Sequence, residues 1–239
     1  EAAVLGAKIR NTLELNYPAH LVEVLVITDG STDGSEDIVR AFPQVKLIHA
    51  TQRLGKAAAI NKAMAAITHP FVVITDANTL INPDSLRLML PHYKDNQVGA
   101  VSGEKKVMVM ENSGAGEQGE GLYWKYESFL KKNDAVIGTL VGAAGELLSF
   151  RRELFQPLEP DTILDDFVLS LRICVQGFRV AYEPAAWAME RGSPSIRDEQ
   201  VRKVRIAAGG FQAMKRLPSL FEFGKHPLLT FQYISHRVL

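Results

Sequence analysis

Acidic residues follow two predicted strands at equivalent positions. The apolar run 22–27 leads to Asp29, and the run 71–75 leads to Asp76. Ligands of open parallel sheets bind beyond the carboxyl ends of the strands. Aspartate also favours turns without any ligand, so either segment alone could be structural. Because both segments fall at one predicted sheet edge, together they favour a binding site.

Asp76 is followed by a second oxygen-bearing side chain, Asn78. In an extended loop, alternate side chains face the same way, so both could approach one ion. Oxygen ligands suit Mg²⁺ or Mn²⁺, which bridge the oxygens of a diphosphate. This spacing is common by chance, so it predicts a metal site only together with the other residues of the edge.

A lysine occupies the first turn of a predicted helix over residues 55–67. Lys56, which follows Gly55, opposes the helix dipole at this end. A bound phosphate would offset that cost, because helix N-termini bind anions. A solvated lysine at a frayed end is the better interpretation when Lys56 is taken alone. A nucleotide-binding P-loop is excluded, since Ala50 and Ala57 replace its first glycine and its hydroxyl residue.

Two adjacent carboxylates begin the predicted helix 164–175. Asp165 is placed to cap this helix, and acidic residues in a first turn usually only complement the dipole. Asp166 would then be free for chemistry, with a pKa raised by its like-charged neighbour. The pair is therefore a candidate for acid–base catalysis.

Two further helices carry residues that could contact substrates. The predicted helix 196–215 contains a basic run that includes Arg202 and Lys203. This run is either a solvated face or a clamp on a diphosphate. The predicted helix 119–132 is rich in aromatic residues, among them Trp124. Aromatic side chains pack in a core more often than they stack on a sugar ring, and both interpretations stay open for Trp124.

The elements that must hold these residues alternate between strand and helix. Strands are predicted at 22–27, 45–49, 71–75 and 98–102, with a short one ending near residue 150. Helices are predicted at 1–15, 35–41, 55–67, 119–132, 164–175 and 196–215, and another begins at residue 82. This alternation predicts a Rossmann-like α/β fold with a mainly parallel sheet flanked by helices. Since a strand normally feeds the first helix, we expect that the first strand is missing and that the chain is a fragment.

Composition excludes some classes of function. The 239 residues include 27 acidic and 27 basic side chains, so the formal charge at pH 7 is zero. Nucleic-acid binding favours a net basic face, and nucleic acid is therefore not an expected partner. The lone cysteine, Cys174, cannot form an internal disulfide, which indicates a reducing compartment and a buried, non-catalytic thiol. No run reaches the roughly 18 consecutive apolar residues typical of a membrane helix.

Taken in order, these motifs resemble those of the family 2 glycosyltransferases, which have the GT-A fold. The resemblance extends from the first residue to about residue 214. The family's first acidic segment holds the base of the nucleotide, a role that carries over to Asp29. Its Gly-Lys segment also lines the nucleotide and corresponds to Gly55 and Lys56. Its metal motif corresponds to Asp76 and Asn78.

The acceptor side shows the same likeness. Residues 142–146 resemble the acceptor-binding segment of the family, which implies a role for Gly145. Asp165 and Asp166 lie where the family has its acidic pair. The resemblance implies that the second member, Asp166, is the catalytic base.

The chain looks most like the membrane-bound polysaccharide synthases of the family. Residues 200–204 lie where these enzymes carry a Gln-x-x-Arg-Trp motif, which implies donor contacts from Arg202 and Lys203. Transmembrane helices follow the catalytic domain in that branch. The resemblance therefore implies a catalytic domain over residues 1–215 and an amphipathic segment, 216–239, leading towards the cytoplasmic face of the cell membrane.

Three residues depart from the family pattern. Asn78 replaces the second metal-binding aspartate. Lys203 and Val204 replace the Arg-Trp pair of the Gln-x-x-Arg-Trp motif, and Thr28 replaces the first aspartate of the usual pair. The first departure weakens the expected metal site, and the second puts strict processivity in doubt.

The resemblance implies an inverting transfer of a sugar from a nucleotide-sugar donor, expected to be a UDP-sugar, to a hydroxyl of a saccharide or lipid-linked acceptor. Asp166 would take the acceptor proton, and Mg²⁺ or Mn²⁺ would neutralise the departing diphosphate. The implied process is cell-surface polysaccharide or glycolipid synthesis. Two alternatives stay open: a non-catalytic nucleotide-sugar-binding subunit of a polysaccharide assembly and, ranked lower, a nucleotidyltransferase.

Overall fold

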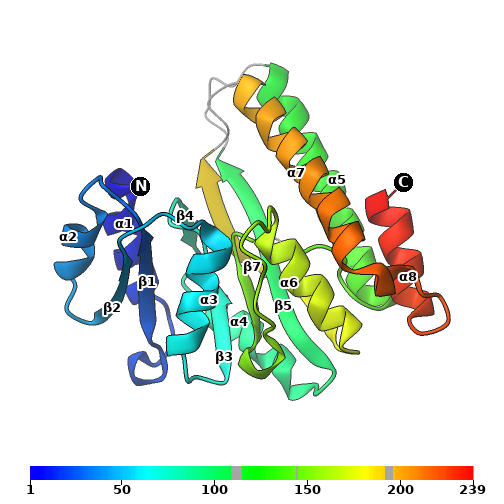
Figure 1. Cartoon of the computed structure of the whole chain (residues 1–239), viewed down its shortest axis with the longest axis horizontal. Helices are drawn as coiled ribbons and strands as arrows, with labels where there is room; N and C mark the ends of the chain where they lie inside the picture. Colours follow the sequence, from blue (N-terminus) through cyan, green and yellow to red (C-terminus); the bar gives the residue numbers. More distant parts are fainter. Residues whose placement is uncertain (109–114, 144, 192–195, 239) are drawn as a thin grey trace.

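The computed structural model describes residues 1–108, 115–143, 145–191 and 196–238. Its strands form a parallel pair, β1 and β2 (Figure 1), and a five-stranded sheet in the order β3-β6-β5-β7-β4. The strands are β1 (Val24–Asp29), β2 (Val45–Ala50), β3 (Phe71–Ile74), β4 (Thr79–Ile81), β5 (Val98–Met108), β6 (Leu148–Arg151) and β7 (Arg179–Arg191).

The helices lie close to their predicted positions. They are α1 (Ala2–Leu13), α2 (Ser35–Arg40), α3 (Lys56–Ala66), α4 (Ser85–Met89), α5 (Ala115–Ile137), α6 (Asp165–Val175), α7 (Ile196–Arg216) and α8 (Pro227–Tyr233), which continues into the π-helical turn η5 (Ile234–Val238). Most helical predictions are thus confirmed to within a few residues. The strands β4 and β7 were not predicted.

The sheet is mixed, whereas the sequence predicts a mainly parallel one. Pairing is parallel between β1 and β2 and between β5 and β7. By contrast, β6 runs antiparallel to both β3 and β5, and β4 runs antiparallel to β7. A short apolar run contains no information about strand direction, which explains the difference. Because β6 is reversed, the loop before it lies at the edge where β3 ends: Ile74 pairs with Leu148.

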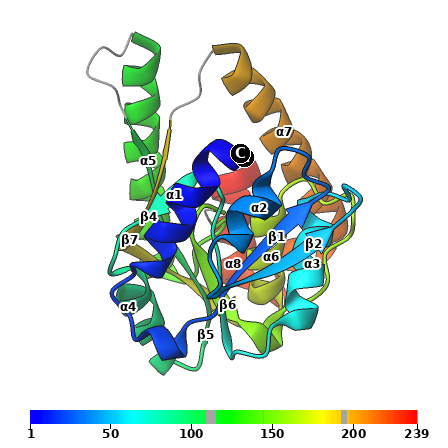
Figure 2. The same ribbon diagram turned by 90° about the vertical axis from the view of Figure 1, so that its left-hand side faces the viewer.

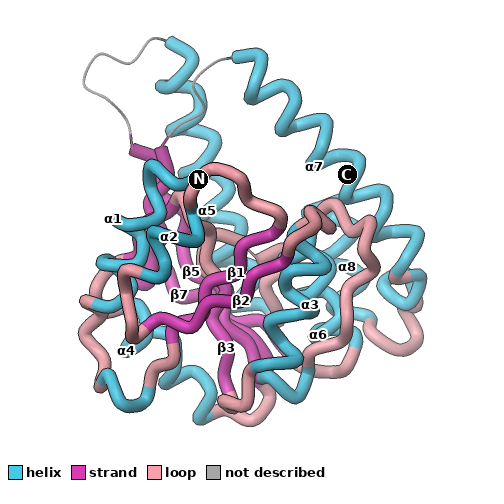
Figure 3. Tube along the Cα trace, turned by 60° about the vertical axis from the view of Figure 1, so that its left-hand side comes forward, coloured by secondary structure: helices cyan, strands magenta, loops and turns pink. Residues whose placement is uncertain are grey.

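Helices cover both faces of the five-stranded sheet (Figures 2 and 3). One face packs on α4, in a cluster that includes Met89, Val101 and Leu147. The other face belongs to a larger core shared by α3, α6 and α8. On the β1–β2 pair, α1 and α2 contribute a third cluster around Ile9 and Val39.

The segment after residue 215 shares the larger core. Leu217 and Leu229 are buried, and Leu220 and Tyr233 are completely buried. The predicted amphipathic segment is therefore packed into the same core as the helix that carries Asp165 and Asp166. Within the described ranges, no helix combines the length and apolar character needed to cross a membrane.

Cys174 lies inside this core on α6, as predicted. Burial raises the pKa of its thiol to about 11, against a smaller opposing effect of the hydrogen bond with Thr139. A thiol with this pKa stays protonated near neutral pH and is a poor nucleophile.

Candidate active site

The predicted site residues come from segments that meet at one edge of the fold. Asp29 is the last residue of β1, and Asp76 lies two residues after β3. Gly145 precedes β6, and Asp165 begins α6. Long-range pairing of β3 with the reversed β6 brings the predicted donor-binding and acceptor-binding segments together.

Asp29 holds the entrance to α3. Its two carboxylate oxygens accept hydrogen bonds from the backbone N–H groups of Leu54, at 2.9 Å, and Gly55, at 2.7 Å. The next residue, Gly30, has φ +61°, and a Cβ on it would lie 2.6 Å from the nitrogen of Arg53. Only glycine fits this approach. Asp29 and Gly30 therefore fix the loop that leads to Lys56.

Lys56 bridges the two acidic segments. Its ammonium nitrogen lies 2.8 Å from Oδ1 of Asp76 and 3.3 Å from Oδ2 of Asp165. Burial opposes the charge of Lys56, but the carboxylates of Asp165 and Asp76 outweigh it and raise the pKa of the ammonium. Lys56 is therefore paired rather than free at a frayed helix end, although its side chain is still 46% exposed.

Asp165 does not cap α6. The N-cap position belongs to Leu164, and no side chain makes a capping hydrogen bond there. Asp165 is buried and faces Lys56 instead. The capping prediction fails because an ion pair with a distant helix uses the same carboxylate.

Asp166 lies against the backbone of the predicted acceptor-binding segment, of which the structure describes residues 141–143 and 145–146 and which is named the acceptor-side loop. A Cβ on Gly145 would lie 2.5 Å from Oδ2 of Asp166, so the carboxylate occupies the space that a side chain would need. Burial, followed by the charge of Asp165, raises the pKa of Asp166 to about 7, with a contribution from Glu146 and an opposing one from Lys56. A carboxylate with this pKa can accept a proton near neutral pH.

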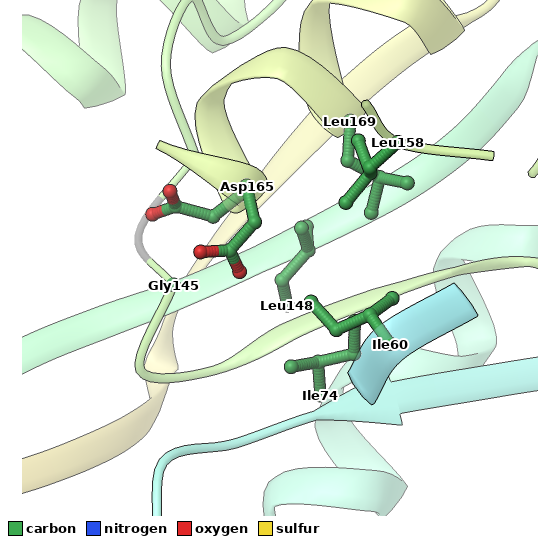
Figure 4. A pocket seen from close by; sticks show the side chains of 8 residues that line it. Ile60, Ile74, Gly145, Leu148, Leu158, Asp165 and Leu169 are labelled. Atoms are coloured by element: carbon green, nitrogen blue, oxygen red, sulfur yellow. The ribbon is translucent and has the colours of Figure 1, made fainter. Parts of the chain in front are cut away.

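The two aspartates border a narrow pocket with apolar walls. Figure 4 shows Asp165 near Gly145, with the aliphatic side chains gathered beside them. The aliphatic lining consists of Ile60, Ile74, Leu148, Leu158 and Leu169. Such surroundings stabilise an ionised carboxylate less well than water does. The apolar walls thus explain why burial is the largest cause of the raised pKa of Asp166.

Asn78 belongs to a charged network that sequence reasoning missed. Its amide nitrogen donates to Glu190 at 3.1 Å. Lys105, which is 3% exposed, pairs with Glu190 and with Glu146 of the acceptor-side loop. The network connects the predicted metal loop to the neighbourhood of Asp166. Lys105 directly follows Glu104 in the sequence, and this local context gives no signal of a buried cation.

The chain supplies only part of a metal coordination shell. In the described ranges, no three His, Cys, Asp or Glu residues cluster closely enough to hold an ion. Asp76 offers a carboxylate that is shared with Lys56, and Asn78 offers one amide oxygen. Mg²⁺ commonly takes one or two protein oxygens and completes its shell with phosphate and water. The two residues fit that incomplete type of site.

A second lysine, also missed, lies beside the predicted metal loop. Lys8 of α1 is 6% exposed and donates to Oγ1 of Thr75 at 2.7 Å. Burial lowers the pKa of Lys8 to about 8, although the charge of Asp76 opposes this effect. The loop therefore contacts cations from two different helices, α1 and α3.

Three predicted contact residues lie on the long helices. Arg202 and Lys203 lie on α7. Nη1 of Arg202 is 3.6 Å from Oε2 of Glu199, and Lys203 is exposed. Trp124 lies on α5, but its side chain falls outside the described part of the structure. Figure 2 shows these helices standing apart at their outer ends. Substrate contacts from these three residues stay predictions.

The sequence of the chain matches a known protein family. Residues 1–158 match the model of glycosyl transferase family 2. Poly-beta-1,6-N-acetyl-D-glucosamine synthases of Staphylococcus epidermidis and Staphylococcus aureus (strain COL) are 24% and 23% identical over 223 residues, 90% of this chain and 53% of each relative. The chain thus spans about half the length of these curated relatives.

Two solved structures share the fold. The mannosyltransferase PcManGT from Pyrobaculum calidifontis, in complex with GDP-Man and Mn²⁺, has a TM-score of 0.79 at 27% identity, covering 98% of this chain and 66% of that one. S. aureus TarS, in complex with UDP-GlcNAc, has a TM-score of 0.62 at 14% identity, covering 82% and 57%. The chain therefore belongs to glycosyl transferase family 2, with the GT-A fold of these glycosyltransferases.

Proposed function

We propose that the chain catalyses inverting transfer of a sugar from a nucleotide-sugar donor to a hydroxyl acceptor, with Asp166 as the base. The observation that carries this proposal is the placement of Asp166 against Gly145 beside an apolar pocket. The acceptor oxygen would attack the anomeric carbon while Asp166 takes its proton, and the nucleoside diphosphate would leave from the opposite face. A positioned base contributes about 10²–10⁴ to the rate.

The donor side is built around Lys56. Its ammonium group, already held near Asp76, is placed to pair with the diphosphate. We assign the base-binding role to Asp29, whose hydrogen bonds to the start of α3 connect it to Lys56. Arg202 and Lys203 are proposed as further diphosphate contacts.

We propose that Asp76 and Asn78 hold Mg²⁺ or Mn²⁺. A divalent ion would supply charge neutralisation for the departing diphosphate. The Mn²⁺ in the PcManGT complex supports this proposal. Asn78, a neutral ligand, predicts weaker binding than a second carboxylate would give.

The donor is proposed to be a UDP-sugar, with a GDP-sugar as the second candidate. The complexes of TarS with UDP-GlcNAc and of PcManGT with GDP-Man support these two choices. The acceptor is proposed to be a saccharide or lipid-linked hydroxyl, which Gly145 and Trp124 would contact. The named relatives are polysaccharide synthases, which supports a role in cell-surface polysaccharide or glycolipid synthesis. The proposed location is the cytoplasmic face of the membrane.

The decisive experiment compares Asp166→Asn with Asp37→Asn, a matched change at an 84% exposed side chain. Calorimetric titration with UDP and GDP measures donor binding, and release of the nucleoside diphosphate from UDP-GlcNAc or GDP-Man measures turnover. We expect Asp166→Asn to keep its nucleotide affinity and to lose turnover by about 10²-fold or more. Near-normal turnover would rule out Asp166 as the base.

A second titration tests the metal and the non-catalytic alternative. Asp76→Ala should abolish any increase in UDP affinity that Mn²⁺ produces in the unmodified chain. Donor binding without any turnover in the unmodified chain would favour a nucleotide-sugar-binding subunit. Release of diphosphate from a nucleoside triphosphate would instead favour a nucleotidyltransferase.

A further inference from the structure

The guanidinium group of Arg237 lies on the acceptor-side loop. Arg237 belongs to η5, which directly continues α8 near the end of the chain. Its Nε donates to the carbonyl of Val141 at 2.9 Å, and Nη2 is 3.5 Å from the carbonyl of Gly142. Nη2 also donates to Glu127 of α5 at 2.7 Å. The side chain is 22% exposed, and that of Glu127 is 10% exposed.

Gly142 is enclosed between Arg237 and the helix that carries Asp166. Gly142 has φ +88°. A Cβ there would lie 2.9 Å from Nε of Arg237 and 2.9 Å from Cε2 of Phe167, the neighbour of Asp166. The loop is therefore in contact with η5 on one side and α6 on the other.

The same loop reaches the proposed base at Gly145. Ala143 is held on α6 by Ser170, whose Oγ is 3.5 Å from its backbone nitrogen, and Gly145 lies against Asp166. Arg237 thus contacts one end of a segment whose other end borders the carboxylate. Gly142 and Gly145 have no Cβ, so no side chain of their own holds the backbone at these two positions.

We propose that Arg237 is a positioning residue, which holds residues 141–143, and through them Gly145, at the distance from Asp166 that an acceptor hydroxyl needs. This inference rests on the proposed function. It assigns a role in transfer to the C-terminal segment, which lies outside the region matched by the family model. The pair with Glu127 fixes the guanidinium in a partly buried place, so that both loop carbonyls meet a rigid donor.

The test compares Arg237→Ala and Arg237→Lys with Arg216→Gln. Arg216 is a similarly covered arginine, 17% exposed, which pairs with Asp161 and Thr162 and does not contact the loop in the described structure. All variants are made in the 239-residue chain. Donor affinity is measured with UDP and GDP, and hydrolysis of UDP-GlcNAc or GDP-Man is compared with transfer to octyl glucoside and chitobiose.

We expect Arg237→Ala to keep donor affinity and donor hydrolysis within about twofold while transfer falls about tenfold to a hundredfold. The KM for the acceptor should rise. Arg237→Lys should recover part of the loss, because its ammonium can still reach one carbonyl, and Arg216→Gln should lower the melting temperature alone. Parallel losses of donor affinity and transfer in Arg237→Ala would overturn the proposal.

Amide hydrogen exchange tests the same proposal without activity. Arg237→Ala should speed exchange in peptides covering 141–147 more than in those covering 45–66, and Arg216→Gln should not. Unchanged exchange over 141–147 would overturn the positioning role even if the unmodified chain transfers sugar. If the unmodified chain binds no donor, the proposed function fails, whereas faster exchange would still support Arg237 as the residue that holds the loop.

Discussion

The carboxylate of Asp166 fills the space where a side chain of residue 145 would begin. A Cβ on Gly145 would lie 2.5 Å from Oδ2 and 2.9 Å from Cγ of Asp166. Asp166 is half-buried and borders the pocket with apolar walls. The identity of residue 145 therefore controls the position of the proposed base.

Gly145→Ala is expected to displace Asp166 and to lower transfer about tenfold or more, because small displacements of reacting groups are costly. Overpacking of this kind also destabilises a fold by about 1–3 kcal/mol. Gly210→Ala on α7, where a Cβ meets nothing within 4 Å, is the control and should leave transfer unchanged. Rates and urea unfolding measure both effects. Full activity in Gly145→Ala would contradict the assigned geometry.

The rate of transfer should depend on the ionisation of Asp166. Its pKa of about 7 predicts that kcat rises with pH through this value, because only the carboxylate form accepts a proton. A pH–rate profile between pH 5 and 9 measures the acidic limb. A limb centred near the ordinary aspartate pKa of about 4 would assign the proton transfer to another group.

The raised pKa of Asp166 should also lower the free energy of unfolding as pH rises. The folded chain holds the Asp166 proton up to about pH 7, whereas the unfolded chain releases it near pH 4. The unfolded state therefore binds fewer protons between these values, and stability falls as pH rises from about 4 to 7. Asp166→Asn should be more stable than the unmodified chain at pH 8 and nearly equal to it at pH 4. Equal urea midpoints at pH 8 would argue against a buried, ionised Asp166.

Lys56→Met should weaken donor binding and shift the acidic limb upward. The ammonium contacts both Asp76 and Asp165, and its charge lowers the pKa of Asp166. Loss of a charged partner costs about tenfold or more in affinity. Lys62→Met, on the exposed side of the same helix, is the matched control. If both variants bind UDP and GDP as the unmodified chain does, Lys56 is not a diphosphate contact.

His236 is expected to make stability depend on pH near the C-terminus. Burial opposes its charge, but the hydrogen bond with Asp134 and the carboxylate of Glu127, 3.8 Å from Nε2, outweigh this effect and the repulsion of Arg237, so the pKa is raised. The stabilisation is complete below the unfolded pKa of about 6.5 and is lost as pH rises through the higher folded value. His236→Gln should therefore be destabilising at pH 6 and nearly neutral at pH 10. Melting curves would show no such difference for the exposed His20→Gln.

Local patterns in the sequence were sufficient to place much of the site. Asp29 ends β1 and Asp76 comes shortly after β3, and both strands have a clear apolar run. Asp166 lies in the first turn of α6, which has a clear helical period. The family's order of motifs then connected them. The ion pairs of Lys56 were outside the reach of this reasoning, because they join α3 to the β3 loop and to α6.

Other parts of the structure had no local signal. The three-residue strand β4 is too short to show the alternation of apolar and polar residues typical of a strand. In β7, Pro184 and charged residues interrupt the apolar ones. Lys105 pairs with Glu146 and Glu190, which are 41 and 85 residues away along the chain. One sequence cannot reveal contacts at such separations, and the same applies to Arg237 and Val141.

The two ion pairs of Lys56 also restrict which substitutions can accumulate during evolution. Because one cation pairs with Asp76 after β3 and with Asp165 on α6, a change at position 56 alters both carboxylates at once. The effects of substitutions at Lys56, Asp76 and Asp165 should therefore be non-additive. Among descendants of this chain, these three positions are expected to change together or to stay fixed, even though they lie on separate elements.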